Sequence, residues 1–314
     1  MSATIAPGLS VRATVWNSPI LLLGLTALIW AGHSIVGRLA TGAIGPMTLT
    51  AGRWALAIVP ILMVAWKDLK TDAPRLLERW PYVAAMGALG YTGFNALFYV
   101  AAHATTAINL SIIQGVVPAI VLIGAFFWLG APVTARQAIG VAATILGVVA
   151  IACEGDPAKL LKLAFNHGDV LMAAAAVIYA AYTLALAKKP IVKPFSLLAG
   201  FALAALVTSL PLVAWEVASG GFVRPTAMGL FALAYAAIGP AFISQALFMR
   251  GVDLIGPGRA GVYVNLVPVF GAVLGVALLG EPFHLYHLLA LALVAGGVWL
   301  AQSAARKQGT PWAR

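Results

Sequence analysis

Four amide side chains interrupt otherwise apolar stretches of this sequence, and they are well suited to bind a polar molecule. Asn95 and Gln245 each precede the tripeptide Ala-Leu-Phe, and Gln114 and Asn265 each precede a proline by three or four residues. An amide donates and accepts hydrogen bonds without carrying a charge, which suits a neutral ligand. Amides are costly in hydrocarbon, so we expect these four to face a water-filled cavity. Hydrogen bonding that only joins neighbouring helices is the alternative.

The two prolines that follow these amides predict flexible points. Pro118 has no N–H to donate to the carbonyl of Gln114, and Pro268 has none for the carbonyl of Val264. Carbonyls freed in this way are tolerated inside a membrane where they line a cavity or meet a polar neighbour. We expect Gly115, Pro118 and Pro268 to act as hinges, with a static kink that improves packing as the alternative.

Aromatic and hydroxyl side chains accompany the amides. His33 is the only histidine well inside an apolar run, where it is able to bind a ligand, to titrate, or only to join two helices. Such a lining suits a neutral molecule with an apolar body and a few polar atoms. The candidate cavity residues are Trp30, His33, Ser34, Tyr91, Asn95, Tyr99, Ser111, Gln114, Tyr179, Tyr182, Gln245, Tyr263 and Asn265.

Charged groups are missing from the middle of the apolar runs. Asp169, Glu216 and Glu281 lie close to predicted helix ends, so no central carboxylate is available to carry a coupling ion. If the chain moves a ligand across the membrane, movement down the ligand's own gradient is therefore expected, with proton coupling through His33 as the fallback. Arg53 lies near a helix start and is expected to extend to the membrane interface. Without a central Arg or Lys, phosphate-bearing substrates are disfavoured.

The composition requires a lipid environment. Of 314 residues, 62% are hydrophobic and 9% are charged, with a mean hydropathy of +0.98, whereas about 25% of the residues of a soluble domain are charged. The formal charge of +10 does not indicate nucleic acid, because the basic residues are scattered singly between apolar runs. The single cysteine, Cys153, excludes an intrachain disulfide. No cofactor or metal is expected.

Ten apolar runs are long enough to span a bilayer as helices. We therefore predict an all-α polytopic membrane protein with one transmembrane domain over residues 1–314. The first run is expected to be a retained helix rather than a signal peptide, because His33 and Ser34 lie within it. The predicted spans are 19–40, 46–66, 81–103, 106–129, 134–152, 168–189, 195–218, 226–249, 257–279 and 284–304, with 67–80 as a connection.

The distribution of Lys and Arg predicts the orientation. With the N-terminus in the cytoplasm, 14 basic residues fall inside and 5 outside, the latter including Arg38 and Arg53. Both termini are therefore expected in the cytoplasm of a bacterial-type inner membrane.

An internal repeat divides the chain into halves at about 19–152 and 168–304. Leu-Gly-Ala-Pro at 129–132 matches Leu-Gly-Glu-Pro at 279–282, and Pro118 matches Pro268. Because each half has five helices, an odd number, the second half enters the membrane from the opposite side. Inverted repeats of this kind are typical of transporters that work by alternating access.

The two five-helix halves, the Trp-Ala-Gly-His-Ser sequence at 30–34, the proline-centred fourth and ninth helices and the Leu-Gly-Glu-Pro ending at Pro282 resemble the EamA family of the drug/metabolite transporter superfamily. The first half departs from this pattern with Ala131 in place of Glu. Within the family the sequence is most similar to bacterial YddG-type exporters of aromatic and other neutral amino acids. The resemblance implies export, whereas drugs or other metabolites, moved with proton coupling, remain open as cargo.

Other classes of function lack their usual signatures. No catalytic motif or pair of intramembrane aspartates is present, so an enzyme is not expected. His284 and His287 have no third ligand candidate except Glu281, so they do not predict a metal site. A channel would need a charged or carbonyl-lined filter. The expected partners are the lipid bilayer and a small neutral organic substrate, without nucleic acid, and a monomer is plausible.

Overall fold

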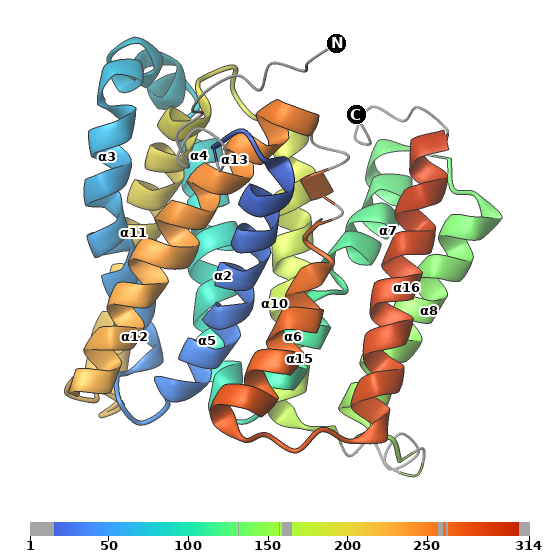
Figure 1. Ribbon diagram of the computed structural model, residues 1–314. Coiled ribbons are helices and arrows are strands. Elements are labelled where there is room, and N and C mark those ends of the chain that lie inside the picture. The colour runs from blue at the N-terminus through green and yellow to red at the C-terminus, as the bar shows by residue number, and fades with distance from the viewer. Residues whose placement is uncertain are drawn as a thin grey trace, which may run out of the picture.

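The computed structural model describes residues 16–130, 132–156, 158, 165–256, 260–261 and 263–307, and all regular structure among them is helical. Eight helices in this part of the chain are long and apolar enough to cross a membrane, and two shorter apolar ones, Leu266–Leu279 and Leu285–Ala301, complete the ten. Figure 1 shows them as one upright bundle. The predicted all-α transmembrane fold of two five-helix repeats is confirmed.

The first repeat runs from α2 to α8. Its elements are α2 (Pro19–Leu39), α3 (Pro46–Glu78), α4 (Trp80–Met86), the π-helical segment η1 (Gly87–Gly93), α5 (Phe94–Ala102), α6 (Ala107–Gln114), α7 (Val117–Leu129) and α8 (Ala135–Ala152). Local signals explain several starts. Thr106 accepts a hydrogen bond from the N–H of Asn109, and Thr134 forms a capping box with Gln137.

The second repeat runs from α10 to α16. Its elements are α10 (His167–Ala185), the short 3₁₀ turn η2 (Leu186–Lys188), α11 (Pro194–Ala218), α12 (Ala227–Ile238), the π-helical segment η3 (Gly239–Ile243), α13 (Ser244–Ile255), α15 (Leu266–Leu279) and α16 (Leu285–Lys307). Gly130 and Gly280 end α7 and α15 in the same left-handed conformation, with φ of 64° and 63°. This conformation favours glycine, so the two matching motifs have the same backbone role in both halves.

Two predicted spans continue further in the structure than the sequence indicates. The segment 67–80, predicted to be a connection, is mostly helix, because α3 continues without interruption to Glu78. Leu76 is buried there, and Asp72 accepts a hydrogen bond of 2.9 Å from the N–H of Lys193. These contacts hold the last turns of α3 against the start of α11. The eighth predicted span also continues past 249, to Ile255.

The helices that carry the predicted hinges are interrupted. The fourth span breaks between Gln114 and Val117, where the N–H of Gly115 bonds back to Ile112 in a tighter turn, and α15 begins only at Leu266. The third and eighth spans instead contain η1 and η3 at repeat-related positions. Single-turn π segments often accompany functional sites.

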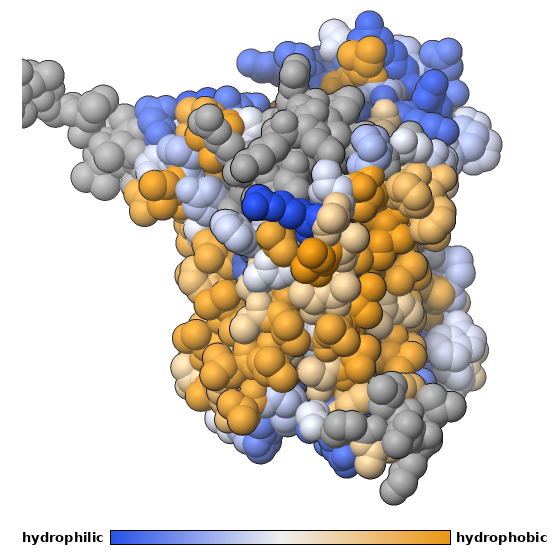
Figure 2. Space-filling model, turned by 90° about the vertical axis from the view of Figure 1, so that its right-hand side faces the viewer, coloured by the Kyte–Doolittle hydropathy of each residue, from blue (hydrophilic) through white to orange (hydrophobic). Residues whose placement is uncertain are grey.

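The helices pack mainly across the two repeats. Helix α2 of the first repeat lies against α13 and α15 of the second. In the same way α3 lies against α11, and α8 lies against α16. The side of the molecule in Figure 2 carries a broad hydrophobic band between hydrophilic ends, as expected for a surface in contact with lipid. In Figure 1 α2 begins and α16 ends at the same end of the bundle, here called the terminal end, and the opposite end is called the distal end. The cytoplasmic placement of the terminal end stays a prediction.

Candidate functional site

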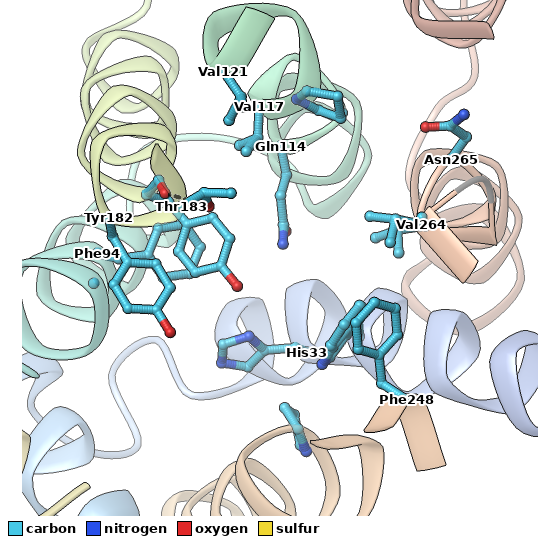
Figure 3. Close-up of a pocket in the computed structure, with 18 of the residues that line it drawn as sticks. His33, Phe94, Gln114, Val117, Val121, Tyr182, Thr183, Phe248, Val264 and Asn265 are labelled. Atoms are coloured by element: carbon cyan, nitrogen blue, oxygen red, sulfur yellow. Dashed lines mark hydrogen bonds between the residues drawn. The ribbon is translucent and has the colours of Figure 1, made fainter. Parts of the chain in front are cut away.

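A cavity of about 520 Å³ lies between the repeats, where the interrupted helices meet. Nine of the candidate residues line it together with all three predicted hinges. They are Trp30, His33, Tyr91, Asn95, Gln114, Tyr179, Tyr182, Gln245 and Asn265, with Gly115, Pro118 and Pro268. In Figure 3 the side chain of Gln114 extends into the cavity, with Tyr182 on one side and Val264 on the other.

The other four candidates lie outside the cavity wall. Ser34, Tyr99 and Ser111 are buried in the packing between helices, and Tyr263 is half-buried. Tyr99 still affects the site, because its hydroxyl lies 2.8 Å from Nε2 of His33. Ser111 instead packs directly against α15, as described below.

Aromatic rings form much of the wall. The ring of Tyr179 lies 5.4 Å from that of Tyr182 and 4.9 Å from that of Phe94, measured between centroids. Trp30 and Phe248, from α2 and α13, form a second pair at 5.4 Å. Pairs of this kind present polarised ring faces and edges to a ligand as well as apolar surface. The cavity therefore suits a molecule with a flat, apolar body.

Arg53 is the charged residue that the sequence interpretation misplaced. The expected extension to the membrane interface is wrong: the side chain is 4% exposed and lines the cavity. Its Nη1 donates to Oδ1 of Asn95, and lies 3.1 Å from the Tyr99 hydroxyl and 3.1 Å from Nε2 of His33. The guanidinium carbon also lies 4.9 Å from the ring centroid of Trp54. A basic residue therefore does reach the centre, so the lack of one is no longer a reason to disfavour phosphate-bearing substrates.

The position of Arg53 along the axis of its helix is the signal in the sequence that indicates its burial. It follows Pro46, the first residue of α3, by seven positions, which places it roughly 10 Å along the axis at about 1.5 Å per residue. A side chain at that depth reaches the interface only if it points along the helix toward its start. Here Asn95 and Tyr99, one turn apart on α5, instead provide hydrogen-bonding partners inside the bundle.

Two of the carboxylates near helix ends, Glu216 and Glu281, cap other helices at the distal end. Glu216 accepts hydrogen bonds of 2.8 and 3.0 Å from the N–H groups of Met47 and Thr48, the start of α3. Glu281 accepts bonds of 2.8 and 3.0 Å from those of Ala107 and Ile108, the start of α6. Unpaired N–H groups and the helix dipole both favour an anion at these positions. No carboxylate is among the described residues that line the cavity.

The distal end of the cavity is closed by contact between α6 of the first repeat and α15 of the second. A Cβ added at Gly271 would lie 2.0 Å from Oγ of Ser111, and one added at Gly275 would lie 2.7 Å from Cγ1 of Ile108. Only glycine allows so close an approach. Toward the terminal end the lining continues to Leu186 and Ala301. We call the contact of α6 with α15 and Glu281 the distal closure.

Glu281→Gln is expected to loosen the distal closure. The carboxylate holds two backbone N–H groups, and hydrogen bonds to a charged group each contribute roughly 1.5–3 kcal/mol. The measurement is maleimide labelling of Ile108→Cys, which is fully buried, in a Cys153→Ala background. Labelling should be slow with Glu281 and several-fold faster with Glu281→Gln. Asp253→Asn, an exposed site on α13, is the control, and equal rates in all variants would contradict the assignment.

Gly271→Ala is expected to lower thermal stability by separating α6 from α15. Ser111 must move to admit the added Cβ, and overpacking of this kind costs about 1–3 kcal/mol. Ser111→Gly removes both side-chain atoms that the Cβ would meet at 2.0 and 2.2 Å. Combined with Gly271→Ala it should restore part of the lost melting temperature of the purified protein. If the double variant loses as much melting temperature as the two single variants together, the contact between Ser111 and the added Cβ does not cause the loss of stability in Gly271→Ala.

Sequence comparison identifies the family. The EamA-like transporter family matches residues 17–153 and, a second time, residues 166–302. The chain belongs to the EamA-like transporter family. Each repeat of the structure thus corresponds to one EamA unit, and the protein is a multi-pass membrane transporter.

Three relatives of this EamA protein are also described only as transporters. YyaM of Bacillus subtilis (strain 168), an uncharacterized transporter, is 23% identical over 92% of this chain and 95% of its own length. YetK of the same organism, also an uncharacterized transporter, is 26% identical over 87% and 84%. An uncharacterized transporter of Archaeoglobus fulgidus is 27% identical over 89% and 96%. A solved crystal structure covers 92% of this chain and 99% of its own with a TM-score of 0.62 and 23% identity, which shows the fold alone.

Proposed function

We propose that this EamA transporter exports neutral amino acids, aromatic ones above all, by alternating access, driven by the substrate gradient. The observation that carries the proposal is one cavity of about 520 Å³ lined by aromatic rings and by amides from both repeats. A volume in this range accommodates a molecule of the size of an amino acid. Export rather than import rests on the resemblance to amino-acid exporters, because the gradients set the direction of a facilitator.

Alternating access is supported by the unequal ends of the cavity. The distal closure joins one helix of each repeat, whereas the lining continues toward the terminal end. In an inverted repeat, the opposite state is reached when the two halves exchange conformations. The breaks at Gly115 and before Leu266 lie beside the cavity and provide the points at which α6 and α15 would separate.

Transport without ion coupling is supported by the chemistry of the cavity. A coupled transporter usually keeps an intramembrane carboxylate for its ion, and none lines the described part of the cavity. His33, the fallback for proton coupling, already has Tyr99 and Arg53 within hydrogen-bonding distance of its Nε2. These contacts support a role of the ring in joining α2 to α5 and α3 rather than in carrying a proton.

Counterflow in proteoliposomes tests the proposal. Vesicles are preloaded with unlabelled phenylalanine, threonine, glutamate or a sugar phosphate, and labelled phenylalanine is added outside with no pH gradient. Saturable accumulation that only the neutral amino acids support is the expected result. If the folded protein accumulates no label under any preload, but transports another metabolite or a drug when a pH gradient is imposed, the proton-coupled alternative replaces this one.

Gln114→Leu and Asn265→Leu are expected to reduce phenylalanine counterflow by about tenfold each, the effect of losing roughly 1.4 kcal/mol of binding. Both amides line the cavity, and leucine keeps a similar volume without hydrogen bonds. Size-exclusion profiles should remain those of wild type. Wild-type counterflow in both variants would remove these amides from the site.

A further inference from the structure

The guanidinium of Arg53 is a permanent charge held inside the transmembrane bundle. Its side chain is 4% exposed, and arginine does not lose its proton in proteins. A charge at such a depth is costly unless an opposite charge or a full set of hydrogen bonds compensates it. The groups around it therefore decide whether Arg53 is complete by itself or requires a ligand.

The protein compensates this charge only in part. The hydrogen-bonding partners of Nη1 are Asn95, Tyr99 and His33, and none of them carries a negative charge. Within the described residues Arg53 forms no salt bridge with a carboxylate. At the distal end Glu216 and Glu281 are engaged in helix caps, and Asp169 accepts hydrogen bonds from Thr105 and Asn109. Nε of Arg53 is buried without any hydrogen-bonding partner. An arginine that only braced the helices would be expected to use this donor as well.

A second unpartnered donor lies next to the first along the chain. Nε1 of Trp54 is buried without a partner, and both Arg53 and Trp54 line the cavity. Trp54 stacks on Tyr91 with ring centroids 4.6 Å apart, which fixes its indole. Arg53 and Trp54 therefore bring a positive charge and two buried, unpartnered N–H groups to the wall of an aromatic cavity. A carboxylate on an aromatic molecule is the complementary ligand.

We propose that Arg53 is the binding residue for the carboxylate of the transported molecule, and that the cavity selects its cargo by that carboxylate rather than by an ammonium group. The proposal rests on the proposed function for the aromatic part of the cargo and adds the group that is recognised. In the empty cavity the substrate anion is the missing counterion of Arg53. Binding of the anion completes the hydrogen bonds of the guanidinium and removes the cost of an uncompensated charge.

The proposal distinguishes the two charged ends of an amino acid. The described lining offers an ammonium group no carboxylate, only the ring faces and neutral acceptors such as Oε1 of Gln114, which is buried without a partner. The ammonium group is therefore dispensable. Aromatic monocarboxylates that lack it belong to the same substrate class, and aromatic amines that lack the carboxylate do not.

Competition in wild-type protein is the first arm of the test. Counterflow of labelled phenylalanine is measured against 3-phenylpropionate, which lacks the ammonium group, and 2-phenylethylamine, which lacks the carboxylate. We expect 3-phenylpropionate to compete within about threefold of unlabelled phenylalanine, and the amine to be at least about 30-fold weaker, as loss of charge-assisted hydrogen bonds predicts. An amine that competes as well as phenylalanine, or better than 3-phenylpropionate, overturns the proposal.

The second arm measures binding without transport. The melting temperature of purified protein is recorded with 3-phenylpropionate for wild type, Arg53→Gln, Arg53→Lys and the control Arg250→Gln, whose guanidinium bonds to Asn17 away from the cavity. The ligand should stabilise wild type and the control, stabilise Arg53→Lys less, and leave Arg53→Gln unchanged. Equal stabilisation of wild type and Arg53→Gln overturns the proposal, as does no stabilisation of wild type.

The two arms separate this proposal from the proposed function. If phenylalanine shows no counterflow but 3-phenylpropionate stabilises wild type and not Arg53→Gln, the cargo is a carboxylate other than an amino acid, and the role of Arg53 stands. If phenylalanine is transported and Arg53→Gln, shown to be folded, transports it equally well, the proposed function stands and the role of Arg53 fails.

Discussion

Asn95→Asp is expected to lower phenylalanine counterflow by about 100-fold, equivalent to roughly 2.8 kcal/mol, while the protein stays folded. Oδ1 of Asn95 already accepts a hydrogen bond from Nη1 of Arg53. An aspartate there gives the guanidinium a permanent internal counterion of nearly unchanged shape, and it gives up the hydrogen bond that Nδ2 of Asn95 donates to the carbonyl of Tyr91. The substrate carboxylate must then compete with this counterion for the guanidinium, so transport is lost through competition rather than through unfolding.

Two variants make this result specific. Asn17→Asp creates the same change beside Arg250, since Oδ1 of Asn17 lies 2.9 Å from Nη2 of that arginine outside the cavity, and it should leave counterflow unchanged. Asn95→Leu removes the hydrogen bond without supplying a charge, and it should lower both stability and transport. Wild-type counterflow in folded Asn95→Asp would show that Arg53 needs no free charge to bind substrate.

Locking the distal closure with a disulfide is expected to stop transport completely. Cysteines at Ile108 and Gly275 would lie in contact, because a Cβ at Gly275 falls 2.7 Å from Cγ1 of Ile108, and a disulfide requires Cβ atoms about 3.5–4.5 Å apart. In a Cys153→Ala background the only disulfide that can form then joins the two repeats. Oxidation should abolish counterflow and a reductant should restore it, because α6 and α15 must separate to open the distal end.

The single cysteine variants serve as controls for this experiment, since neither can form an internal bond. Mass spectrometry of the oxidised double variant establishes how much of the protein is cross-linked. Full transport by protein that is completely cross-linked would show that the distal end does not open, and alternating access through it would have to be abandoned.

The sequence was sufficient to predict the helical architecture, because run length and repeat spacing depend on local composition. It failed where an amphipathic helix leaves the membrane: the end of α3 at 67–78 is polar enough to resemble a loop, and only its contact with the start of α11 explains why the helix continues. The π segments η1 and η3 were missed for a similar reason. Their glycines and proline signal an irregularity without specifying its kind.

The candidate site was predicted in part. Amides and aromatic rings in apolar runs indicated a cavity, and nine of those residues line it. Helix periodicity gives a face but not the neighbour that the face meets, so Ser34 and Ser111 were assigned to the cavity although they pack between helices. Arg53 was missed because its environment depends on Asn95 and Tyr99, which the sequence places more than 40 residues away.

A structure determined by electron cryomicroscopy in saturating phenylalanine would show where the substrate binds. We expect ligand density in the cavity, with the carboxylate within about 3 Å of the Arg53 guanidinium, a charge-assisted hydrogen-bond distance, and the ring against Tyr179 or Phe248. Density elsewhere, a carboxylate turned away from Arg53, or an empty cavity would contradict it.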